Sequence, residues 1–513
     1  MLVGDIIRRN ARRYTTKPAV INGGREISWL ALDERANRLG SHLLERGLVP
    51  GDRVAVCARN TLEWPEIAFG LAKAGLVVVP VNIRLSAPEI EYQLADCGAR
   101  AGIVHTDQAE LAAAAFATLN VVVQIGGDDL GPEYESVLDR GRAANLRPAG
   151  LTPDSLHYLL YTSGTTGRPK GVISVQRGSI AQAIDTSLVT EANRSDVMLA
   201  TTPFFTAGGM LRTLSWMYLG QTMVIHDRFD PEAVVDAIER QRVTFSTFIP
   251  TMLMRTLRVL EEQPHHDVSS LRRISYGSAP VPPGLAQEAT DRLGCDLQQR
   301  YGLTEGGGQW TILTPQDHRD AVAGKTHLLG SCGKETPQSE LRVVDGEGRE
   351  LPPGEVGEIV GIAESNAVGY WNRPEESAKT FRADGVHSGD YGYLDEEGYL
   401  FIAGRRTDMI ISGGFNVYPA EIERVLGEHP DVDLVAVVGA ASAEWGETPV
   451  AVVVPRGEVD RDDLQQQLTT LARANLAGYK QPRAFQFRSA LPLGPAGKIL
   501  KREIRESLPP DLV

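Results

Sequence analysis

A run of glycine, hydroxyl and lysine residues at positions 161–171 points most directly to chemistry. It reads Tyr-Thr-Ser-Gly-Thr-Thr-Gly-Arg-Pro-Lys-Gly and follows the strand-like residues 157–160. Its glycines allow the backbone to approach a ligand closely, its hydroxyls can donate hydrogen bonds, and Lys170 supplies a mobile positive charge. The run therefore predicts a phosphate-binding loop. It is not a Walker A loop, because the GxxxxGK[ST] spacing is absent.

The composition indicates a large folded protein with an acidic surface. The chain has 513 residues, of which 42% are hydrophobic and 23% charged, values typical of globular proteins with several domains. Lys and Arg total 52 against 66 Asp and Glu, which gives a net charge of −14. An acidic surface of this kind repels polyphosphate chains. The balance argues against nucleic acid as the main partner.

Cysteine placement and hydropathy predict a cytoplasmic protein without an integral membrane segment. The four cysteines are scattered and show neither CxxC nor Cys/His spacing, so no zinc site or disulfide framework is indicated. Residues 1–14 lack the apolar core of a signal peptide. The most membrane-like stretch, 197–226, is interrupted by Pro203 and Arg212. We expect a buried strand–helix–strand unit there and no membrane span.

The elements that must position the loop alternate between strands and helices. From residue 54 to about 301, short β-branched runs alternate with amphipathic segments of helical length. Ser86 should cap a helix that continues through Leu94. We expect further strands at 77–81, 222–225 and 243–249, and helices at 231–241 and 283–293. The pattern predicts an α/β fold whose large N-terminal domain, residues 1–406, contains doubly wound sheets.

The composition and the hydrophobic pattern of the sequence change after residue 330. Glycine and proline become frequent and apolar runs shorten, which predicts a small β-rich subdomain over residues 330–406. Residues 407–513 should form a mobile α+β C-terminal domain. Its expected elements are a helix at 419–427, strands at 432–438 and 450–454, and a helix capped by Asp460 that runs to Ala474.

An ordered series of motifs resembles the adenylate-forming superfamily, which includes AMP-forming acyl-CoA synthetases, luciferases and peptide-synthetase adenylation domains. The motifs are YTSGTTGRPKG at 161–171, PFFTAGG at 203–209, YGSAP at 276–280, YGLTE at 301–305, HSGD at 387–390, GRRTDMIISGGFNVYPAEIE at 404–423 and GPAGKILKREI at 494–504. The resemblance extends over nearly the whole chain. It implies an acyl-CoA ligase that joins a carboxylic acid to AMP, releases pyrophosphate, and passes the acyl group to the CoA thiol.

The resemblance also implies roles for single residues and names ATP, Mg²⁺ and coenzyme A as ligands. Lys498 matches the catalytic lysine that bridges the carboxylate and the α-phosphate, Asp390 the carboxylate that holds the ribose, and Arg405 an arginine near ribose and phosphate. Glu305 matches the Mg²⁺ contact and Thr304 a phosphate contact. The other expected ligand contacts are Thr162, Ser163, Gly164, Thr165, Thr166, Gly167 and Lys170 for phosphate; Gly277, Ser278, Ala279, Pro280, Tyr301 and Gly302 for adenine; and Ser412, Gly413, Gly414, Trp445 and Arg84 for CoA.

Two positions depart from the family pattern. Many relatives have His where this chain has Thr206, and Asp or Lys at the hinge where it has Thr407. Thr206 stays among the expected catalytic residues with Lys498 and Glu305, but its side chain offers no cation or ring nitrogen. An alternative is therefore a thioesterification-biased enzyme that uses an acyl-adenylate made by a partner adenylating enzyme.

The acid pocket is expected within and after the same motifs. Small side chains there favour a bulky, long-chain, aryl or polycyclic acid. The expected lining residues are Phe204, Phe205, Ala207, Gly208, Gly277, Gly302, Gly306, Gly307 and Gly308. An adenylation enzyme that loads a separate carrier protein is a second alternative. A binding protein that keeps the fold without catalysis would have lost Lys498, Asp390 or Glu305, and all three are present. Whether the chain forms a homodimer stays open.

Overall fold

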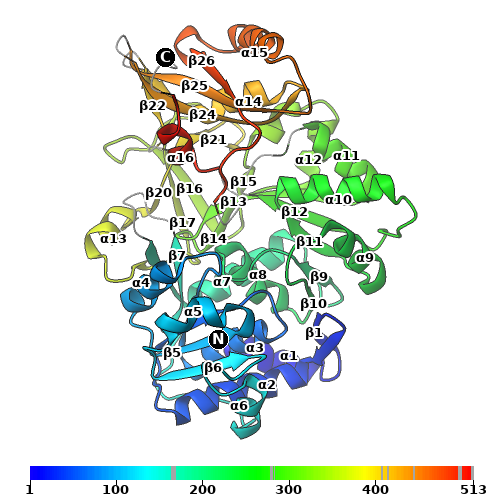
Figure 1. Ribbon diagram of the computed structural model, residues 1–513, viewed down its shortest axis with the longest axis vertical. Coiled ribbons are helices and arrows are strands. Elements are labelled where there is room, and N and C mark those ends of the chain that lie inside the picture. Colours follow the sequence, from blue (N-terminus) through cyan, green and yellow to red (C-terminus); the bar gives the residue numbers. More distant parts are fainter. Residues whose placement is uncertain are drawn as a thin grey trace. The chain divides into compact units, whose positions relative to one another are not determined.

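A computed structural model describes residues 1–162, 169–277, 281, 283–405, 408–412, 415–442, 445–494 and 499–509, apart from the side chains of residues 283, 415 and 416 (Figure 1). The chain divides into two compact units. The first comprises Met1–Thr326, Gly333–Leu341 and Gly361–Ser388, and the second comprises His327–Cys332, Arg342–Val360 and Gly389–Val513. The mixed α/β architecture with a large N-terminal and a smaller C-terminal part confirms the predicted fold class. The domain boundary at Thr407 stays a prediction.

A nine-stranded sheet runs through the first unit. Its strands, in spatial order, are β15 (Lys334–Glu335), β14 (Gly308–Leu313), β13 (Asp296–Leu303), β12 (Arg273–Gly277), β11 (Phe245–Phe248), β9 (Val197–Ala200), β10 (Thr222–Ile225), β1 (Pro18–Asn22) and β2 (Arg25–Ser28). The strands from β13 to β1 are parallel, while β2, β14 and β15 pair antiparallel. The parallel core is the doubly wound arrangement that the alternation of strands and helices predicts.

A seven-stranded sheet forms the second layer of strands in this unit. Its order is β18 (Gly369–Tyr370), β8 (Lys170–Val175), β7 (Leu156–Thr162), β4 (Val77–Pro80), β3 (Arg53–Cys57), β5 (Ala101–His105) and β6 (Val121–Ile125). The strands from β7 to β6 are parallel, and β8 and β18 are antiparallel additions. The antiparallel pairing of β7 and β8 ends at Thr162 and Lys170, the described residues that flank the predicted phosphate loop.

Helices connect and cover these sheets. They are α1 (Gly4–Arg13), α2 (Trp29–Glu45), α3 (Glu63–Ala74), α4 (Ala87–Cys97), α5 (Ala109–Phe116), α6 (Tyr134–Arg140), α7 (Gln176–Val189), α8 (Ala207–Met217), α9 (Pro231–Gln241), α10 (Pro250–Glu262), α11 (Pro283–Leu293), α12 (Pro315–Val322) and α13 (Pro374–Thr380), with short 3₁₀ turns at Thr106–Gln108 and Thr326–Gly330. Both α9 and α11 begin and end where the sequence predicts. Ser86 caps α4 through a capping box with Glu89, and the helix continues to Cys97.

The largest core lies between helices and strands of the first unit. It buries Trp29 of α2, Trp64 of α3 and Trp216 of α8 completely or nearly so, together with aliphatic residues of both sheets. All four cysteines are buried, and none of them is in a disulfide bond. Burial raises the pKa of Cys57 to about 12, so this thiol stays protonated. None of the helices in the described part of the chain combines the length and apolarity needed to cross a bilayer.

The chain after residue 338 contains two five-stranded sheets. The first comprises β16 (Ser339–Val344), β17 (Gly357–Ala363), β20 (Gly385–Leu394) and β19 (Phe381–Arg382), with β21 (Leu400–Arg405) paired to β20. The second comprises β23 (Phe415–Val417), β22 (Ile410–Ser412), β25 (Gly446–Pro455) and β24 (Val432–Ser442), with β26 (Ala484–Phe487) paired to β25. The strands have the β-rich and then α+β character that the sequence predicts for this part of the chain, and the bounds 330–406 and 407–513 stay predictions.

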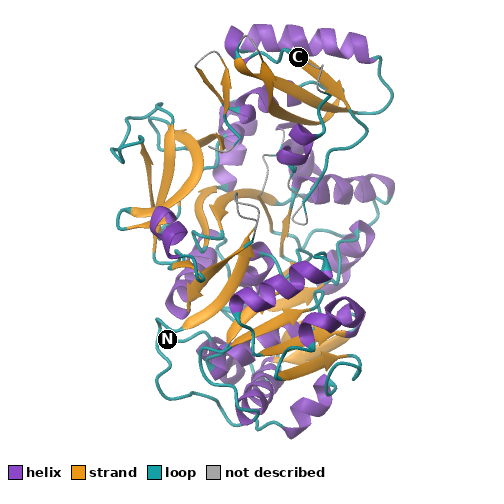
Figure 2. Ribbon diagram, turned by 60° about the vertical axis from the view of Figure 1, so that its left-hand side comes forward, coloured by secondary structure: helices purple, strands orange, loops and turns teal. Residues whose placement is uncertain are grey.

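Helices cover both faces of the last sheet (Figure 2). Residues of α14 (Pro419–Gly427) and α15 (Arg461–Asn475) share a core with Val437, Ala451 and Val453 on one face. On the other face, α16 (Lys501–Glu506) contributes Ile504 to a cluster with Val438 and Val452. A 3₁₀ turn lies at Gly478–Lys480. Asp460 caps α15 by accepting from the backbone N–H groups of residues 462 and 463, as predicted.

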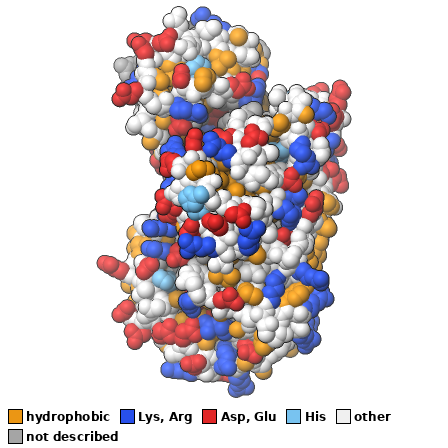
Figure 3. Space-filling view, turned by 90° about the vertical axis from the view of Figure 1, so that its right-hand side faces the viewer, with side chains coloured by type: hydrophobic (Ala, Val, Ile, Leu, Met, Phe, Trp, Pro, Cys, Tyr) orange, Lys and Arg blue, Asp and Glu red, His pale blue; other side chains and the backbone are white. Residues whose placement is uncertain are grey.

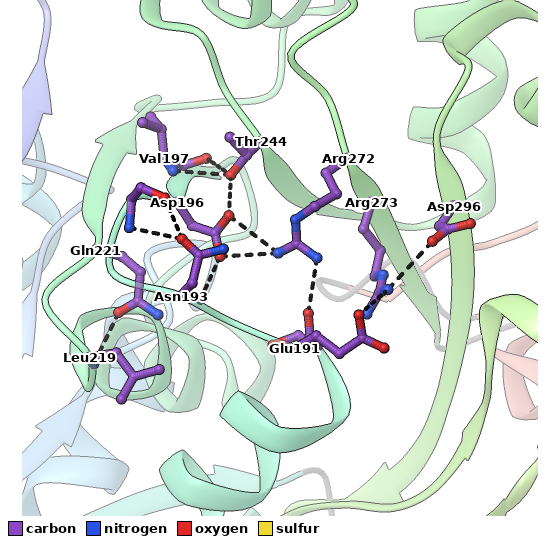
Figure 4. Close-up of polar contacts among 12 residues, drawn as sticks. Glu191, Asn193, Asp196, Val197, Leu219, Gln221, Thr244, Arg272, Arg273 and Asp296 are labelled. Carbon is purple, nitrogen blue, oxygen red and sulfur yellow. Dashed lines mark hydrogen bonds and ion pairs between the residues drawn. The ribbon is translucent and has the colours of Figure 1, made fainter.

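Ion pairs hold the amino ends of the parallel strands in the nine-stranded sheet. On the face drawn in Figure 3, acidic and basic side chains are interspersed. In the cluster drawn in Figure 4, the Asp196 and Arg273 side chains are buried, whereas that of Glu191 is exposed. Arg272 lies 3.0 Å from Asp196, and Arg273 lies 3.2 Å from Glu191 and 3.4 Å from Asp296. Asp196 also accepts from the Thr244 hydroxyl at 2.9 Å. The cluster therefore ties together the starts of β9, β11, β12 and β13.

We expect Asp196→Ala to lower the free energy of unfolding by about 3–5 kcal/mol, because it leaves the Arg272 guanidinium without its buried partner. Asp236→Ala is the matched control: it breaks the solvent-screened Asp236–Arg240 pair on α9, 3.2 Å long, and should cost less than about 1 kcal/mol. Denaturant unfolding of the two variants measures both values. Equal losses would show that the buried cluster contributes no more than a surface pair.

Candidate active site

The expected adenine contacts come from the carboxyl ends of neighbouring strands. Gly277 is the last residue of β12, and it pairs with Arg300 of β13, directly before Tyr301. A Cβ at Gly277 would lie 3.0 Å from the Arg300 carbonyl oxygen, so only glycine fits here without displacement. Ligands of parallel sheets bind at such carboxyl ends. The next expected contacts, Ser278, Ala279 and Pro280, lie outside the described residues.

The predicted phosphate loop lies between β7 and β8 in the sequence. Thr162 at the end of β7 pairs with Lys170 at the start of β8, so the antiparallel hairpin brings both to the base of the loop. The Lys170 ammonium lies 5.1 Å from the centroid of the Tyr370 ring and 4.0 Å from a Glu376 carboxylate oxygen. The other loop contacts, Ser163, Gly164, Thr165, Thr166 and Gly167, lie outside the described residues.

Glu305 lies in the turn between β13 and β14 and is held at two points. Its Oε1 accepts a hydrogen bond from the Tyr370 hydroxyl at 3.0 Å, and its backbone carbonyl accepts from the Ala367 N–H at 2.9 Å. Burial and the Glu305 charge raise the pKa of Tyr370, which keeps this hydroxyl a donor. The structure thus joins the predicted phosphate-loop lysine and the predicted metal-binding carboxylate through one aromatic side chain. Thr304 is half-buried in the same turn.

The glycines around this turn are explained by close packing against neighbouring atoms, whereas the sequence analysis interpreted them as a source of volume in the acid pocket. A Cβ at Gly302 would lie 1.9 Å from the Gly308 carbonyl oxygen, and one at Gly307 would lie 1.8 Å from the Ser365 carbonyl oxygen. A Cβ at Gly306 would meet the Trp310 indole at 2.6 Å. These positions are filled by neighbouring atoms. They therefore give no evidence of empty volume for a large acid.

Thr206 has a structural role at the start of α8. Its hydroxyl donates to the Pro203 carbonyl at 2.7 Å and accepts from the Gly209 N–H at 3.2 Å, which caps the helix. The single hydroxyl hydrogen is therefore already used. A catalytic role for Thr206 stays a prediction.

The other expected acid-pocket residues flank Thr206. Phe204 is only 1% exposed and packs edge-to-face on Trp64 at 6.0 Å, so it belongs to the core rather than to an accessible surface. Phe205 is also buried. Ala207 and Gly208 form the first turn of α8 and are half-buried. Among these four expected pocket residues, only Ala207 and Gly208 keep exposed surface.

Asp390 and Arg405, the expected ribose and phosphate contacts, are paired in the second unit. They face each other across β20 and β21, with the Arg405 Nε 3.1 Å from Asp390 Oδ1. The Asp390 side chain is 10% exposed and that of Arg405 is 53% exposed. The carboxylate is thus fixed by a neighbouring cation while the guanidinium reaches solvent.

Two of the expected CoA contacts also lie together in the second unit. Ser412 of β22 pairs with Gly446, the residue after Trp445. Trp445 is exposed, and the Arg483 guanidinium lies 5.7 Å from the centroid of its ring. An exposed aromatic ring with a stacked cation suits a nucleotide base. Arg84, in the first unit, is exposed just before α4. Gly413, Gly414, Thr407 and the catalytic candidate Lys498 lie outside the described residues.

Sequence reasoning missed Tyr370 and Arg483. Tyr370 reaches Glu305 because β18 pairs with β8, although the two strands are about 200 residues apart in the chain. No local pattern signals that pairing. Arg483 precedes β26, and its proximity to Trp445 follows from the parallel pairing of β25 and β26. Only the three-dimensional fold identifies either residue.

Comparisons with known proteins cover almost the full chain. The AMP-binding enzyme family matches residues 7–371, and the AMP-binding enzyme C-terminal domain matches residues 421–498. A feruloyl-CoA synthase of Amycolatopsis sp is 37% identical over 501 residues, 97% of each chain. A fatty acid–[acyl-carrier-protein] ligase of Streptomyces coeruleorubidus is 36% identical over 506 residues, 97% of this chain and 94% of the relative.

A solved structure shows the same fold. The anthranilate CoA ligase AuaEII, in complex with anthranoyl-AMP, superposes with a TM-score of 0.89 at 29% identity, over 99% of this chain and 97% of that one. The family match over residues 7–371 and the shared fold both assign the chain to one family. This chain belongs to the AMP-binding enzyme family, the adenylate-forming superfamily that its motifs resemble.

Proposed function

We propose that this AMP-forming acid–thiol ligase binds ATP with Mg²⁺, activates a carboxylic acid as its acyl-adenylate, and transfers the acyl group to coenzyme A. The observation that carries the proposal is the Lys170–Tyr370–Glu305 group. It combines a cation for phosphate with a carboxylate for metal at the base of the phosphate loop. Positioned charges of this kind stabilise phosphoryl and nucleotidyl transfer.

Glu305 fits a role in holding Mg²⁺. Tyr370 engages one of its carboxylate oxygens, and the other makes no hydrogen bond to a residue in the described ranges. A hard, ionised oxygen held in a fixed orientation is the ligand that Mg²⁺ prefers, and the metal would neutralise phosphate charge. Tyr370 positions this carboxylate, and Lys170 attracts phosphate oxygens.

Asp390 and Lys498 complete the proposed machinery. The Asp390 carboxylate would accept hydrogen bonds from the ribose hydroxyls, while its pairing with Arg405 keeps it in one orientation. Lys498 would lie between the reacting carboxylate and the α-phosphate, where two anions must approach each other. Ser412, Trp445 and Arg483 would flank coenzyme A in the second step.

We propose an aryl or otherwise bulky acid as substrate class. The feruloyl-CoA synthase and the anthranilate CoA ligase are both named for aromatic acids, which supports this choice. The similarity to a fatty acid–[acyl-carrier-protein] ligase keeps a carrier-protein acceptor as second candidate. A cytoplasmic location is supported by the four buried cysteines, none of which is in a disulfide bond. A homodimer and a partner adenylating enzyme stay predictions.

Thioester formation from two forms of the acid tests the proposed function. We expect CoA thioesters, identified by mass, both from free aryl acids with MgATP and from presynthesised acyl-adenylates. Turnover from the adenylate alone would support the thioesterification-biased alternative, with a partner performing the first step. Product on a carrier protein but not on CoA would favour the second acceptor.

Lys498→Ala should separate the two half-reactions. We expect acyl-AMP formation to fall by about 10²- to 10³-fold, since one preorganised charge of this kind contributes about 3–4 kcal/mol to the transition state. Attack of CoA on a supplied acyl-adenylate should remain within about tenfold of wild type. Pyrophosphate release and thioester formation measure the two steps. An equal loss in both would contradict the assignment of Lys498 to adenylation.

Tyr370→Phe should weaken the use of MgATP. The substitution removes the hydrogen bond to Glu305, and hydrogen bonds to charged groups contribute about 1.5–3 kcal/mol, so we expect kcat/KM for MgATP to fall by about 10- to 100-fold. Tyr218→Phe, whose hydroxyl has no hydrogen bond to a described residue, is the control. Titration with Mg²⁺ at fixed ATP should show a higher requirement in Tyr370→Phe only. An unchanged Mg²⁺ dependence would argue against Tyr370 as a positioning residue.

A further inference from the structure

A cavity of about 390 Å³ lies in the first unit, and none of the expected ATP, coenzyme A or acid contacts lines it. Its walls include the carboxyl ends of parallel strands from both sheets: Asn22 ends β1, His105 ends β5 and Ile125 ends β6. The first residues of α3 and α6 line it too, and these elements are grouped in the lower part of Figure 1. Ligands of open α/β sheets bind at such carboxyl ends. The position and the volume therefore fit a small-molecule site.

Acidic side chains dominate the walls of this cavity. Glu63, Glu133, Glu135 and Asp227 contribute four carboxylates, whereas Arg25 contributes one guanidinium. Helices α3 and α6 begin here, and each N-terminus adds roughly half a positive charge. The walls therefore keep a net charge of about −2 once both helix ends are included. Such a cavity attracts a cationic ligand and repels a nucleotide or another anion.

Three of these carboxylates are held in place through one oxygen. Glu63 Oε1 lies 2.9 Å from Arg25, and the Glu63 side chain is only 5% exposed. Glu133 Oε2 accepts a backbone N–H in the first turn of α6 at 3.1 Å, and Asp227 Oδ1 accepts from the Asn22 amide at 2.9 Å. The second oxygen of each carboxylate makes no hydrogen bond to a described residue. Three oriented acceptors are thus left for a ligand that donates hydrogen bonds.

Thr61 gives an independent indication of a ligand. It lines the cavity and is 8% exposed, and its hydroxyl has no hydrogen-bond partner among the residues that the structure describes. A buried hydroxyl without a partner is unfavourable, and a ligand atom bonded to it would offset that cost. The segment is also fixed, since the Asn60 side chain donates to the carbonyls of Thr202 at 3.0 Å and His226 at 3.2 Å. The cavity wall is therefore formed before any ligand binds.

The cavity carboxylates are too far apart for three of them to bind one metal ion. Within the described ranges, three ligand atoms of His, Cys, Asp or Glu come within 4.8 Å of one another only at Asp236, Glu239 and His266. None of these residues lines the cavity. A divalent metal ion needs several oxygen ligands at about 2.0–2.6 Å. A cation whose charges are spaced along a chain fits the separated carboxylates better.

We propose that this cavity binds an aliphatic diamine or polyamine, whose ammonium groups donate hydrogen bonds to Glu63, Glu133 and Asp227. A primary ammonium group has three donors and no acceptor, which matches carboxylate oxygens that have no donor from the protein. The Thr61 hydroxyl accepts a further N–H of the ligand. The site is separate from acyl transfer, and its ligand binds whichever acid the enzyme activates.

Thermal unfolding and titration calorimetry of the full chain test the class of ligand. The probes are spermidine, butane-1,4-diamine, butylamine and Mg²⁺, each compared with NaCl at the same ionic strength. Spermidine and the diamine should raise the Tm and give a measurable Kd, because they bind the folded state. Butylamine, with a single ammonium group, and Mg²⁺ should raise the Tm less. No rise beyond that in NaCl, or an equal rise with Mg²⁺, would overturn the proposal.

Substitutions then assign the binding to this cavity. Glu133→Gln and Asp227→Asn keep an oxygen for the bonds to α6 and to Asn22 but remove the charge. Each should raise the Kd for spermidine by at least about tenfold, as expected for the loss of a charge-assisted hydrogen bond. Thr61→Val removes the hydroxyl at nearly constant volume and should raise the Kd by about two- to tenfold. Unfolding without ligand verifies that each variant is folded.

A matched control separates the cavity from the acidic surface as a whole. Glu458→Gln makes the same change of charge at an exposed position outside the cavity. It should leave the Kd for spermidine within about twofold of wild type, because salt screens distant exposed charges. If Glu458→Gln weakens binding as much as Glu133→Gln does, the polyamine is attracted by the net negative charge alone and the proposed site is wrong.

Discussion

The close backbone packing of the turn between β13 and β14 fixes the position of Glu305, the carboxylate that we propose binds the metal ion. Gly302 lies against the Gly308 carbonyl and Gly307 against the Ser365 carbonyl, so a side chain at either position would push the turn away from its neighbours. The same turn carries Glu305, whose carbonyl and carboxylate are held by Ala367 and Tyr370. Lys170 reaches this group because β8 and β18 are adjacent strands. Small residues here therefore set the position of a carboxylate.

Most of the fold could be predicted from the sequence because local signals and tertiary packing agree. Proline at the first turn and periodic apolar residues define α9 and α14, and the Ser86 and Asp460 caps mark the starts of α4 and α15. The pairing of distant segments could not be predicted in the same way. β1 joins β10, and β18 joins β8, through backbone hydrogen bonds that any short apolar strand could make. Which of these strands pair depends on how the whole core packs.

The candidate site was predictable in its residue types but not in its contacts. The motif spacing places Gly277, Tyr301, Glu305 and Lys170 at strand ends and turns, as the structure does. It gives no information about Tyr370, which depends on the β18–β8 pairing. It also misread the glycines at 306 and 307, because the sequence does not show which atoms fill the space beside a missing side chain.

Thr206 and Arg212 together show how charge is distributed along α8. Thr206 satisfies the helix start with its hydroxyl, which a histidine ring in that position would do less well. Arg212 then places a cation in the second turn, where the positive end of the helix dipole adds to its charge instead of offsetting it. Both effects favour an anion beside the first half of α8. The loss of a histidine here therefore need not leave the acid without positive charge. The Arg212 side chain turns back toward the first turn of α8, since a Cβ at Gly208 would lie 3.2 Å from its Nη1 and 3.9 Å from the Thr206 Oγ1. The positive charge therefore lies beside the same turn that Thr206 caps.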